Sequence, residues 1–135
     1  MLRCLRRYGR LRDEAPLAVA VSMGADSLAL TAAVFELRAR GRIGDVLLIH
    51  VDHGQHDHSA FAAARAVELA AGLGLDVAVE RPALGPGASE AVLRDARYAA
   101  FAAAMRRHGA RTLLIAHHAD DQVETLVMRA QRGTS

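Results

Sequence analysis

A short segment of small and polar residues has the composition of an anion-binding turn. Residues 22–27, with the sequence SMGADS, follow the apolar run Leu17–Val21 and open a helical pattern that continues to Arg40. A strand that turns through small residues into a helix directs backbone N–H groups and the positive helix end at one point, where phosphate binds without a basic side chain. Hydroxyl and carboxylate oxygens in the turn suit phosphate and Mg²⁺, and Asp26 is the candidate metal ligand. The predicted phosphate-binding residues are Ser22, Met23, Gly24, Ala25, Asp26 and Ser27.

Two further polar clusters follow apolar runs that have the pattern of buried strands. Residues 50–54, HVDHG, complete the run Val46–Val51, and residues 117–121, HHADD, follow the run Thr112–Ala116. In an open α/β sheet, ligands bind beyond the carboxyl ends of the strands, where the strand order reverses. Three polar clusters at three such ends therefore predict one shared site.

Each cluster also has a structural explanation. Asp52 and His53 can form an ordinary polar turn, and the favoured interpretation of His50 is a buried histidine that satisfies its hydrogen bonds within a strand. Asp120 and Asp121 suit a helix N-terminus, where carboxylates interact with the positive end of the dipole. These alternatives stay open for each cluster taken alone.

Composition excludes several function classes. The 135 residues include no lysine, so no lysine side chain can bind phosphate, form a Schiff base or act as a nucleophile. The single cysteine, Cys4, excludes an internal disulfide and a CxxC metal or redox site. A zinc site is suggested by the spacing of four histidines but disfavoured by the lack of a helical i, i+4 pair. These histidines are His50, His53, His56 and His58. No apolar run has membrane-spanning length and no secretory signal is evident, so we expect a cytoplasmic protein that does not bind a membrane.

Alternation of apolar runs with helical patterns predicts an α/β fold, in which parallel strands are joined by crossover helices. We expect a Rossmann-like parallel sheet with helices on both faces and the first strand at its centre. The predicted strands are 17–21, 46–51, 76–80 and 112–116, and the predicted helices are 27–40, 59–71, 89–108 and 120–129. The chain ends directly after the last of these with no closing strand, which predicts a domain that is truncated at its C-terminus.

Two segments of different composition make up the chain. Residues 1–15 form a basic arm with five arginines in its first dozen residues, and residues 16–135 form the predicted nucleotide-binding domain. Such an arm can contact nucleic acid phosphates. The favoured interpretation is an amphipathic helix that turns Leu2 and Leu5 inward.

Four sequence blocks, in order, resemble the tRNA(Ile)-lysidine synthetases of the PP-loop ATP pyrophosphatase superfamily. The blocks are SMGADS at 22–27, HVDHG at 50–54, Glu90 with Arg94 and Arg97-Tyr98, and HHADDQVET at 117–125. The family patterns are SGGxDS, HVDHxxR, ExxxRxxRY and HHxDDxxET, followed by an arginine-glycine-serine segment that is similar to residues 132–134. Order and spacing match from Leu17 to the last residue, so the resemblance covers nearly the whole chain as an N-terminal catalytic portion.

The resemblance implies an ATP-dependent tRNA modification. ATP with Mg²⁺ activates the C2 oxygen of the wobble cytidine of tRNA(Ile) as an adenylate, and the amine of free lysine then attacks C2. The implied catalytic residues are Asp26, Asp52, His53, His117, Asp121 and Glu124. Arg94 and Arg97 are implied to contact phosphate or the tRNA backbone, and the structural alternative for both is a solvated helix face.

Two residues depart from the family patterns. Met23 replaces a glycine that gives freedom of φ and close approach to phosphate, and His56 stands where an arginine is usual. These departures keep a second hypothesis open, a noncatalytic nucleotide-binding module or degenerate fragment. A tRNA thiolation enzyme is a third hypothesis, disfavoured by the lone Cys4. The oligomeric state is left open, with a homodimer as one alternative.

Overall fold

The computed structural model describes residues 15–54, 59–85, 87–117 and 122–127. Nearly all of the predicted basic arm lies outside these residues, as do His56, His58, Asp120 and Asp121. The described elements are β1 (Leu17–Ala20), α2 (Ala25–Ala39), β2 (Val46–Val51), α3 (Ser59–Leu73), β3 (Asp76–Glu80), α4 (Glu90–His108), β4 (Thr112–His117) and β5 (Gln122–Val127). Among them, no helix is both long and apolar enough to cross a membrane.

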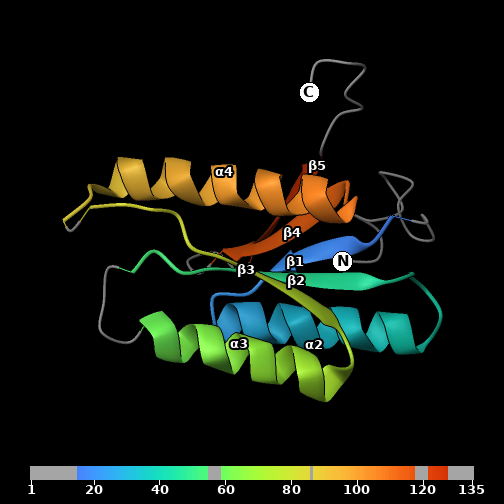
Figure 1. Cartoon of the computed structure of the whole chain (residues 1–135). Coiled ribbons are helices and arrows are strands. Elements are labelled where there is room, and N and C mark those ends of the chain that lie inside the picture. Colours follow the sequence, from blue (N-terminus) through green and yellow to red (C-terminus); the bar gives the residue numbers. More distant parts are fainter. Residues whose placement is uncertain (1–14, 55–58, 86, 118–121, 128–135) are drawn as a thin grey trace.

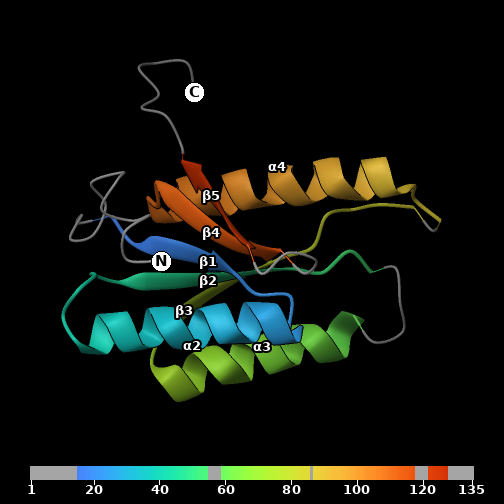
Figure 2. The same ribbon diagram turned by 180° about the vertical axis from the view of Figure 1, so that it is seen from behind.

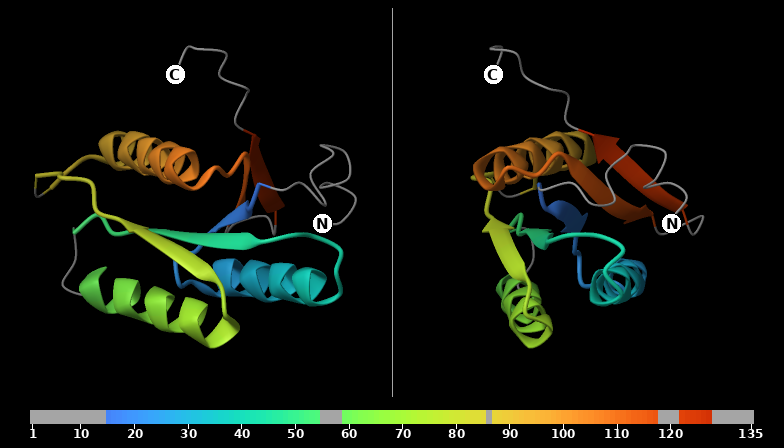
Figure 3. Two further views of the ribbon diagram at one scale, coloured as in Figure 1. Left: turned by 45° about the vertical axis from the view of Figure 1, so that its right-hand side comes forward. Right: turned by 90° about the vertical axis from the view of Figure 1, so that its right-hand side faces the viewer.

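The eight elements form a three-layer α/β structure (Figure 1). The strand order is β3-β2-β1-β4-β5, with β1 parallel to both of its neighbours. Helices α2 and α3 cover one face of the sheet and α4 covers the other (Figure 2), which is clearest in the right-hand view of Figure 3, where the strands are seen nearly end-on. The predicted α/β class, the helices on both faces and the central position of the first strand are confirmed.

Alternating side chains of β1 supply both layers of the core. Leu17 and Val19 are buried in the cluster beneath α2 and α3, whereas Ala18 and Ala20 are buried in the cluster beneath α4. Successive side chains of a strand point to opposite faces, so a strand covered on both faces is apolar at nearly all of its positions. The alanines on the α4 side are small enough for α4 to lie close to the sheet, where Ala104 is fully buried.

The ends of α4 are fixed by capping residues that the sequence predicted. The Ser89 hydroxyl accepts a hydrogen bond from the Val92 N–H at 3.2 Å, and Gly109 ends the helix in the left-handed conformation with φ of 72°. Both are preferred solutions to the unpaired backbone groups of a helix end. This helix carries Arg94, Arg97 and Tyr98, so its ends determine where the arginines lie.

The predicted last helix, at residues 120–129, is wrong. Residues 122–127 form β5, which pairs antiparallel with β4 so that Ile115 lies opposite Glu124 and Leu114 lies opposite Thr125. Without β5, one side of β4 would present unpaired N–H and C=O groups. The alternation of Val123, Thr125 and Val127 also suits a strand, and pairing with β4 overrides the helical pattern. The sheet is therefore mostly parallel with one antiparallel edge strand, and the predicted absence of a closing strand is also wrong.

Candidate functional site

The turn between β1 and α2 is closed by hydrogen bonds between its two serines. The buried Ser27 Oγ accepts from the Ser22 N–H at 3.1 Å and from the Ser22 Oγ at 3.2 Å, and donates to the Gly24 carbonyl at 3.1 Å. The Ser22 Oγ in turn accepts from the Gly24 N–H at 3.3 Å. The turn is therefore held in shape by its own side chains.

Met23 adopts a backbone conformation that favours glycine. Its φ is 72°, and among the described residues no other non-glycine residue has a positive φ. The left-handed conformation costs roughly 1–2 kcal/mol for a residue with a Cβ atom. The Met23 side chain is partly buried against the apolar cluster beneath α2 and α3, which offsets part of this cost. The substitution of glycine by methionine therefore strains the turn and anchors it to the core.

The first turn of α2 follows directly on this turn and therefore lies near the carboxyl end of β1. Gly24 occupies the N-cap position and provides no side-chain acceptor for the first N–H groups of the helix. The half-buried Asp26 lies in this first turn, whereas Ala25 is exposed. The combination of helix N–H groups with one carboxylate is suited to a phosphate that carries a divalent cation, because Mg²⁺ is commonly held by one or two carboxylates together with substrate phosphates.

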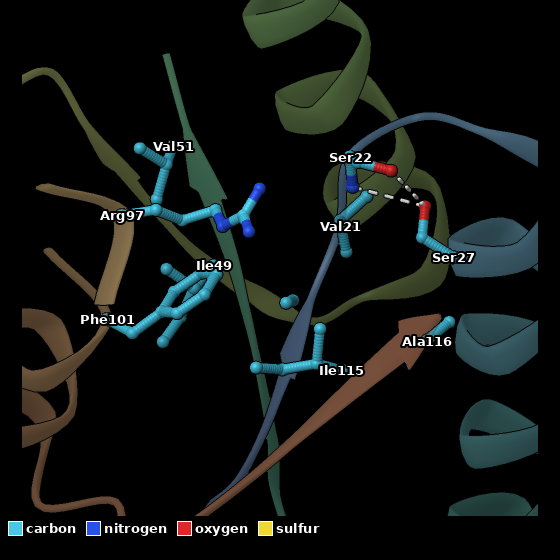
Figure 4. Close-up of a pocket in the computed structure, with 10 residues that line it drawn as sticks. Val21, Ser22, Ser27, Ile49, Val51, Arg97, Phe101, Ile115 and Ala116 are labelled. Atoms are coloured by element: carbon cyan, nitrogen blue, oxygen red, sulfur yellow. Dashed lines mark hydrogen bonds between the residues drawn. The ribbon is translucent and has the colours of Figure 1, made fainter. Parts of the chain in front are cut away.

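A pocket of about 290 Å³ opens beside this turn, between the sheet and α4 (Figure 4). It is bounded by the carboxyl ends of β1, β2 and β4. The chain runs from β1 outward to β2 and β3 and then returns to place β4 on the other side of β1, so the pocket lies at the point where strand order reverses. The lining residues are Ala20, Val21, Ser22, Ser27, Ile49, Val51, Arg97, Phe101, Ile115 and Ala116.

The pocket has an apolar interior and polar groups at two sides. Ile49, Phe101 and Ile115 form its apolar walls, and the Ser22 and Ser27 hydroxyls lie on one side. The Arg97 guanidinium enters from the α4 side and points into the space between the helix and the turn (Figure 4). An apolar cavity with a few convergent polar groups is the usual form of a small-molecule site.

Tyr98 joins the third and fourth sequence blocks. Its hydroxyl donates to Glu124 Oε1 at 3.0 Å, and its ring meets Phe101 edge-on with centroids 5.9 Å apart. The guanidinium carbons of Arg94 and Arg97 lie 5.1 Å and 5.8 Å from the ring centroid. Burial, followed by the hydrogen bond to Glu124, raises the pKa of Tyr98 above its usual value of 10.0. The phenol therefore stays protonated and remains a donor at neutral pH.

Asp52 and His53 follow β2 but do not line the pocket. The Asp52 Oδ1 accepts from the Gly54 N–H at 3.0 Å, and its Oδ2 lies 3.5 Å from Nε of Arg81. Asp52 is 8% exposed. A carboxylate that accepts from the N–H two residues on forms an Asx turn, which is the polar-turn alternative for this segment. The structure supports that structural role for Asp52.

His53 lies near charged side chains of α4. Burial lowers the pKa of His53 below 6.5, the nearby Arg97 lowers it further, and the Asp52 and Glu90 carboxylates oppose this shift. The neighbouring His50 is 4% exposed, and its Nδ1 donates to the Val21 carbonyl at 2.7 Å. The interpretation of His50 as a buried histidine with satisfied hydrogen bonds is therefore confirmed.

The remaining predicted residues are His117, Asp121 and Glu124. His117 is the last residue of that strand, but its side chain and the whole of Asp121 fall outside the described residues. Glu124 is placed on β5, beside the pocket-lining Ile115 with which it pairs. Within the described part of the chain no three His, Cys, Asp or Glu side chains form a metal-binding group. The two C-terminal histidines of the proposed zinc set, His56 and His58, lie outside it.

Three residues with defined positions were not assigned a role from the sequence. Tyr98 was part of a motif, but its contact with Glu124 depends on the pairing of β5 with β4. Phe101 lies one helical turn after Arg97 on the same face of α4, and this spacing could have identified it. Arg81 carries no sequence signal, because its contact with Asp52 joins the ends of two neighbouring strands.

Comparison with known proteins identifies the family. The PP-loop domain pattern matches residues 3–135. The tRNA(Ile)-lysidine synthase of Bordetella parapertussis is 43% identical over 130 residues, covering 93% of this chain and 37% of the relative. The Streptomyces coelicolor protein of the same name is 46% identical over 126 residues, covering 89% of this chain and 35% of the relative. The chain thus spans little more than a third of the length of these two relatives.

A solved structure shows the same fold. The U34-tRNA thiolase NcsA from Methanococcus maripaludis, solved with its [4Fe-4S] cluster, superposes with a TM-score of 0.64 at 17% identity. The match covers 83% of this chain and 40% of that chain. At this identity the likeness concerns the fold and carries no statement about activity. The family assignment rests on the domain pattern, which matches residues 3–135: this chain belongs to the PP-loop domain family.

Proposed function

We propose that this chain is the ATP-binding portion of an enzyme that attaches lysine to the wobble cytidine of tRNA(Ile). One observation carries the proposal: the pocket at the strand-order reversal adjoins the hydrogen-bonded turn of residues 22–27. Relatives at 43% and 46% identity are named tRNA(Ile)-lysidine synthases, which supports this substrate class.

The pocket suits the nucleoside part of ATP. Its volume of about 290 Å³ is at the lower end of the roughly 300–1,000 Å³ typical of small-molecule sites. The apolar walls accommodate a planar base, and the turn at the pocket edge receives the phosphates. Asp26 would hold Mg²⁺ together with these phosphates. The cation would neutralise the negative charge that accumulates on pyrophosphate as it leaves.

The proposed reaction has two steps, and the chain's described residues bind and orient the nucleotide for the first. The C2 oxygen of the cytidine attacks the α-phosphorus of ATP, and the bond to pyrophosphate breaks. The lysine amine then forms a bond to C2, AMP leaves with the former C2 oxygen, and a proton is released. The Arg97 guanidinium, which points into the pocket, and the N–H groups in the first turn of α2, which Gly24 does not cap with a side chain, would stabilise negative charge on the phosphates.

Calorimetric titration with ATP and Mg²⁺ tests the binding part of the proposal. We expect saturable binding by the chain, with Ser27→Ala weakening it because the turn loses three hydrogen bonds. Arg40→Ala is the control, because it removes one hydrogen bond at the opposite end of α2 from Ser27 and Arg40 does not line the pocket. An absence of binding at millimolar ATP would overturn the proposal for this chain.

A noncatalytic nucleotide-binding module is the second candidate, favoured by the strained φ of Met23. Pyrophosphate exchange with ATP, tRNA and lysine separates the two candidates, because exchange requires a working site and binding alone does not. ATP binding without exchange supports the noncatalytic module.

A tRNA thiolation activity gains no support from the fold likeness to NcsA, and the chain has a single cysteine. A cytoplasmic location stays a prediction from the sequence, and the oligomeric state stays open with a homodimer as one alternative.

A further inference from the structure

We propose that Tyr98 is a positioning residue that holds the Arg97 guanidinium over the pocket and thereby orients it toward the phosphates of the nucleotide. The inference rests on the proposed function, because the anion that Arg97 would meet is part of ATP. It assigns a role to the tyrosine that connects α4 to β5.

The Tyr98 ring is fixed by contacts on several sides. Its hydroxyl is anchored by Glu124 at 3.0 Å, and its edge-to-face contact with Phe101 has an interplanar angle of 87°. Phe101 is itself 3% exposed and belongs to the core beneath α4. A ring held at its hydroxyl and against a buried neighbour has little freedom to rotate, so it presents a fixed surface to other side chains.

Arg97 depends on such a surface. Arg97 is exposed, and a long exposed side chain samples many rotamers unless a neighbour restricts it. Its guanidinium carbon lies 5.8 Å from the Tyr98 ring centroid, within the range of a cation–π contact. The guanidinium also lines the pocket opposite Ser22 and Ser27 (Figure 4). Contact with the ring therefore restricts the cation to positions from which it reaches the pocket.

Glu124 contributes to the same arrangement from β5. It pairs with Ile115 of β4, and Ile115 lines the pocket. The carboxylate holds the tyrosine hydroxyl, the tyrosine ring restricts the guanidinium, and the guanidinium enters the pocket. Glu124 of the edge strand β5 thus influences the position of the Arg97 guanidinium in the pocket through the Tyr98 ring.

ATP–Mg²⁺ titrations of the whole chain test this role with four variants. We expect Tyr98→Leu to weaken ATP binding about fivefold, the size of one cation–π contact, and Arg97→Ala to weaken it at least as much. Tyr98→Phe and Glu124→Ala keep the ring and release its anchor, so each should weaken binding about twofold. The double variant Tyr98→Leu/Arg97→Ala should bind no more weakly than Arg97→Ala, because the two residues act through one contact.

Phe61→Leu is the matched control. Phe61 is 62% exposed and lies under the Arg65 guanidinium at 5.7 Å, the same kind of pair on a helix that does not line the pocket. We expect unchanged ATP affinity in this variant.

The contact between Tyr98 and Arg97 can also be measured without ATP. The ring current of Tyr98 should shift an Arg97 resonance in the wild type, and this shift should be lost in Tyr98→Leu.

Each outcome separates the two proposals. Wild-type ATP affinity in a folded Tyr98→Leu variant, or additive losses in the double variant, overturns the positioning role and leaves the proposed function standing. If Tyr98→Leu does not fold, unchanged affinity in both Tyr98→Phe and Glu124→Ala overturns the role instead. A wild-type chain that shows the ring-current shift but binds no ATP overturns the proposed function together with the role assigned to Tyr98.

Discussion

The hydroxyl of Tyr98 donates a hydrogen bond to the Glu124 carboxylate over 3.0 Å, and the two residues are 26 positions apart in the sequence. One lies on α4 and the other on β5, so the contact connects the helix layer to the edge of the sheet. It joins the sequence block on α4 to the block that ends on β5, beside the pocket-lining residues Arg97 and Ile115. The electrostatic consequences of this contact can be measured directly.

We expect Glu124→Gln to lower the pKa of Tyr98. The carboxylate accepts a hydrogen bond from the phenol and repels the phenolate. Both effects raise the pKa of Tyr98, although burial raises it more. Phenolate absorbance during a pH titration measures the shift, in a Tyr8→Phe background because the chain has two tyrosines. Arg94→Ala should have the opposite effect, since the guanidinium lowers this pKa. An unchanged titration in Glu124→Gln would contradict the hydrogen bond.

We expect folding stability to fall as the pH drops below 6.5, in part because of His53. Burial and the Arg97 charge lower the pKa of His53 in the folded chain, so the folded state disfavours the protonated imidazole. A depressed pKa stabilises the fold above the unfolded value, and this contribution is lost as the pH falls. Urea unfolding at pH 7.5 and pH 5.5 measures it. The loss should be smaller in His53→Gln, and an equal loss in both proteins would contradict this prediction.

Met23→Gly should be more stable than Met23→Ala by about 1 kcal/mol. Both variants lose the packing of the methionine side chain on the core, but only alanine retains a Cβ atom at a φ of 72°. Urea denaturation of the two variants and the wild type checks this order. Equal stability of the glycine and alanine variants would show that the turn is unstrained in solution.

Thr112→Val should stabilise the chain by about 1 kcal/mol. Among the described residues the buried Thr112 Oγ1 has no hydrogen-bond partner, and removal of an unsatisfied buried polar atom relieves its desolvation cost. Thr31→Val is the matched control: Thr31 is equally buried, at 2% exposure, but its hydroxyl donates to the Ser27 carbonyl at 2.8 Å. We therefore expect the opposite sign for Thr31→Val. Thermal unfolding of both variants measures the difference, and a destabilised Thr112→Val would contradict the prediction.

Local sequence was sufficient for the elements whose ends and periodicity are strong. The run of residues 46–51 is apolar throughout apart from His50 and forms a strand buried on both faces, as predicted. Ser89 and Gly109 mark the ends of α4 as expected. The failure at residues 122–127 has a definite cause: a helical pattern and a strand pattern coexist there, and pairing with β4 decides between them.

The sequence by itself determined the α/β class, the central first strand and the place of the turn between β1 and α2, because these depend on periodicity, small residues and hydroxyl groups that are adjacent along the chain. Only the tertiary structure decided which polar residues meet. It directs Asp52 to Arg81, away from the pocket lining, and brings Tyr98 to Glu124. Such partners are set by strand order and by the packing of α4 on the sheet, and these non-local contacts leave no spacing in the sequence from which they could be predicted.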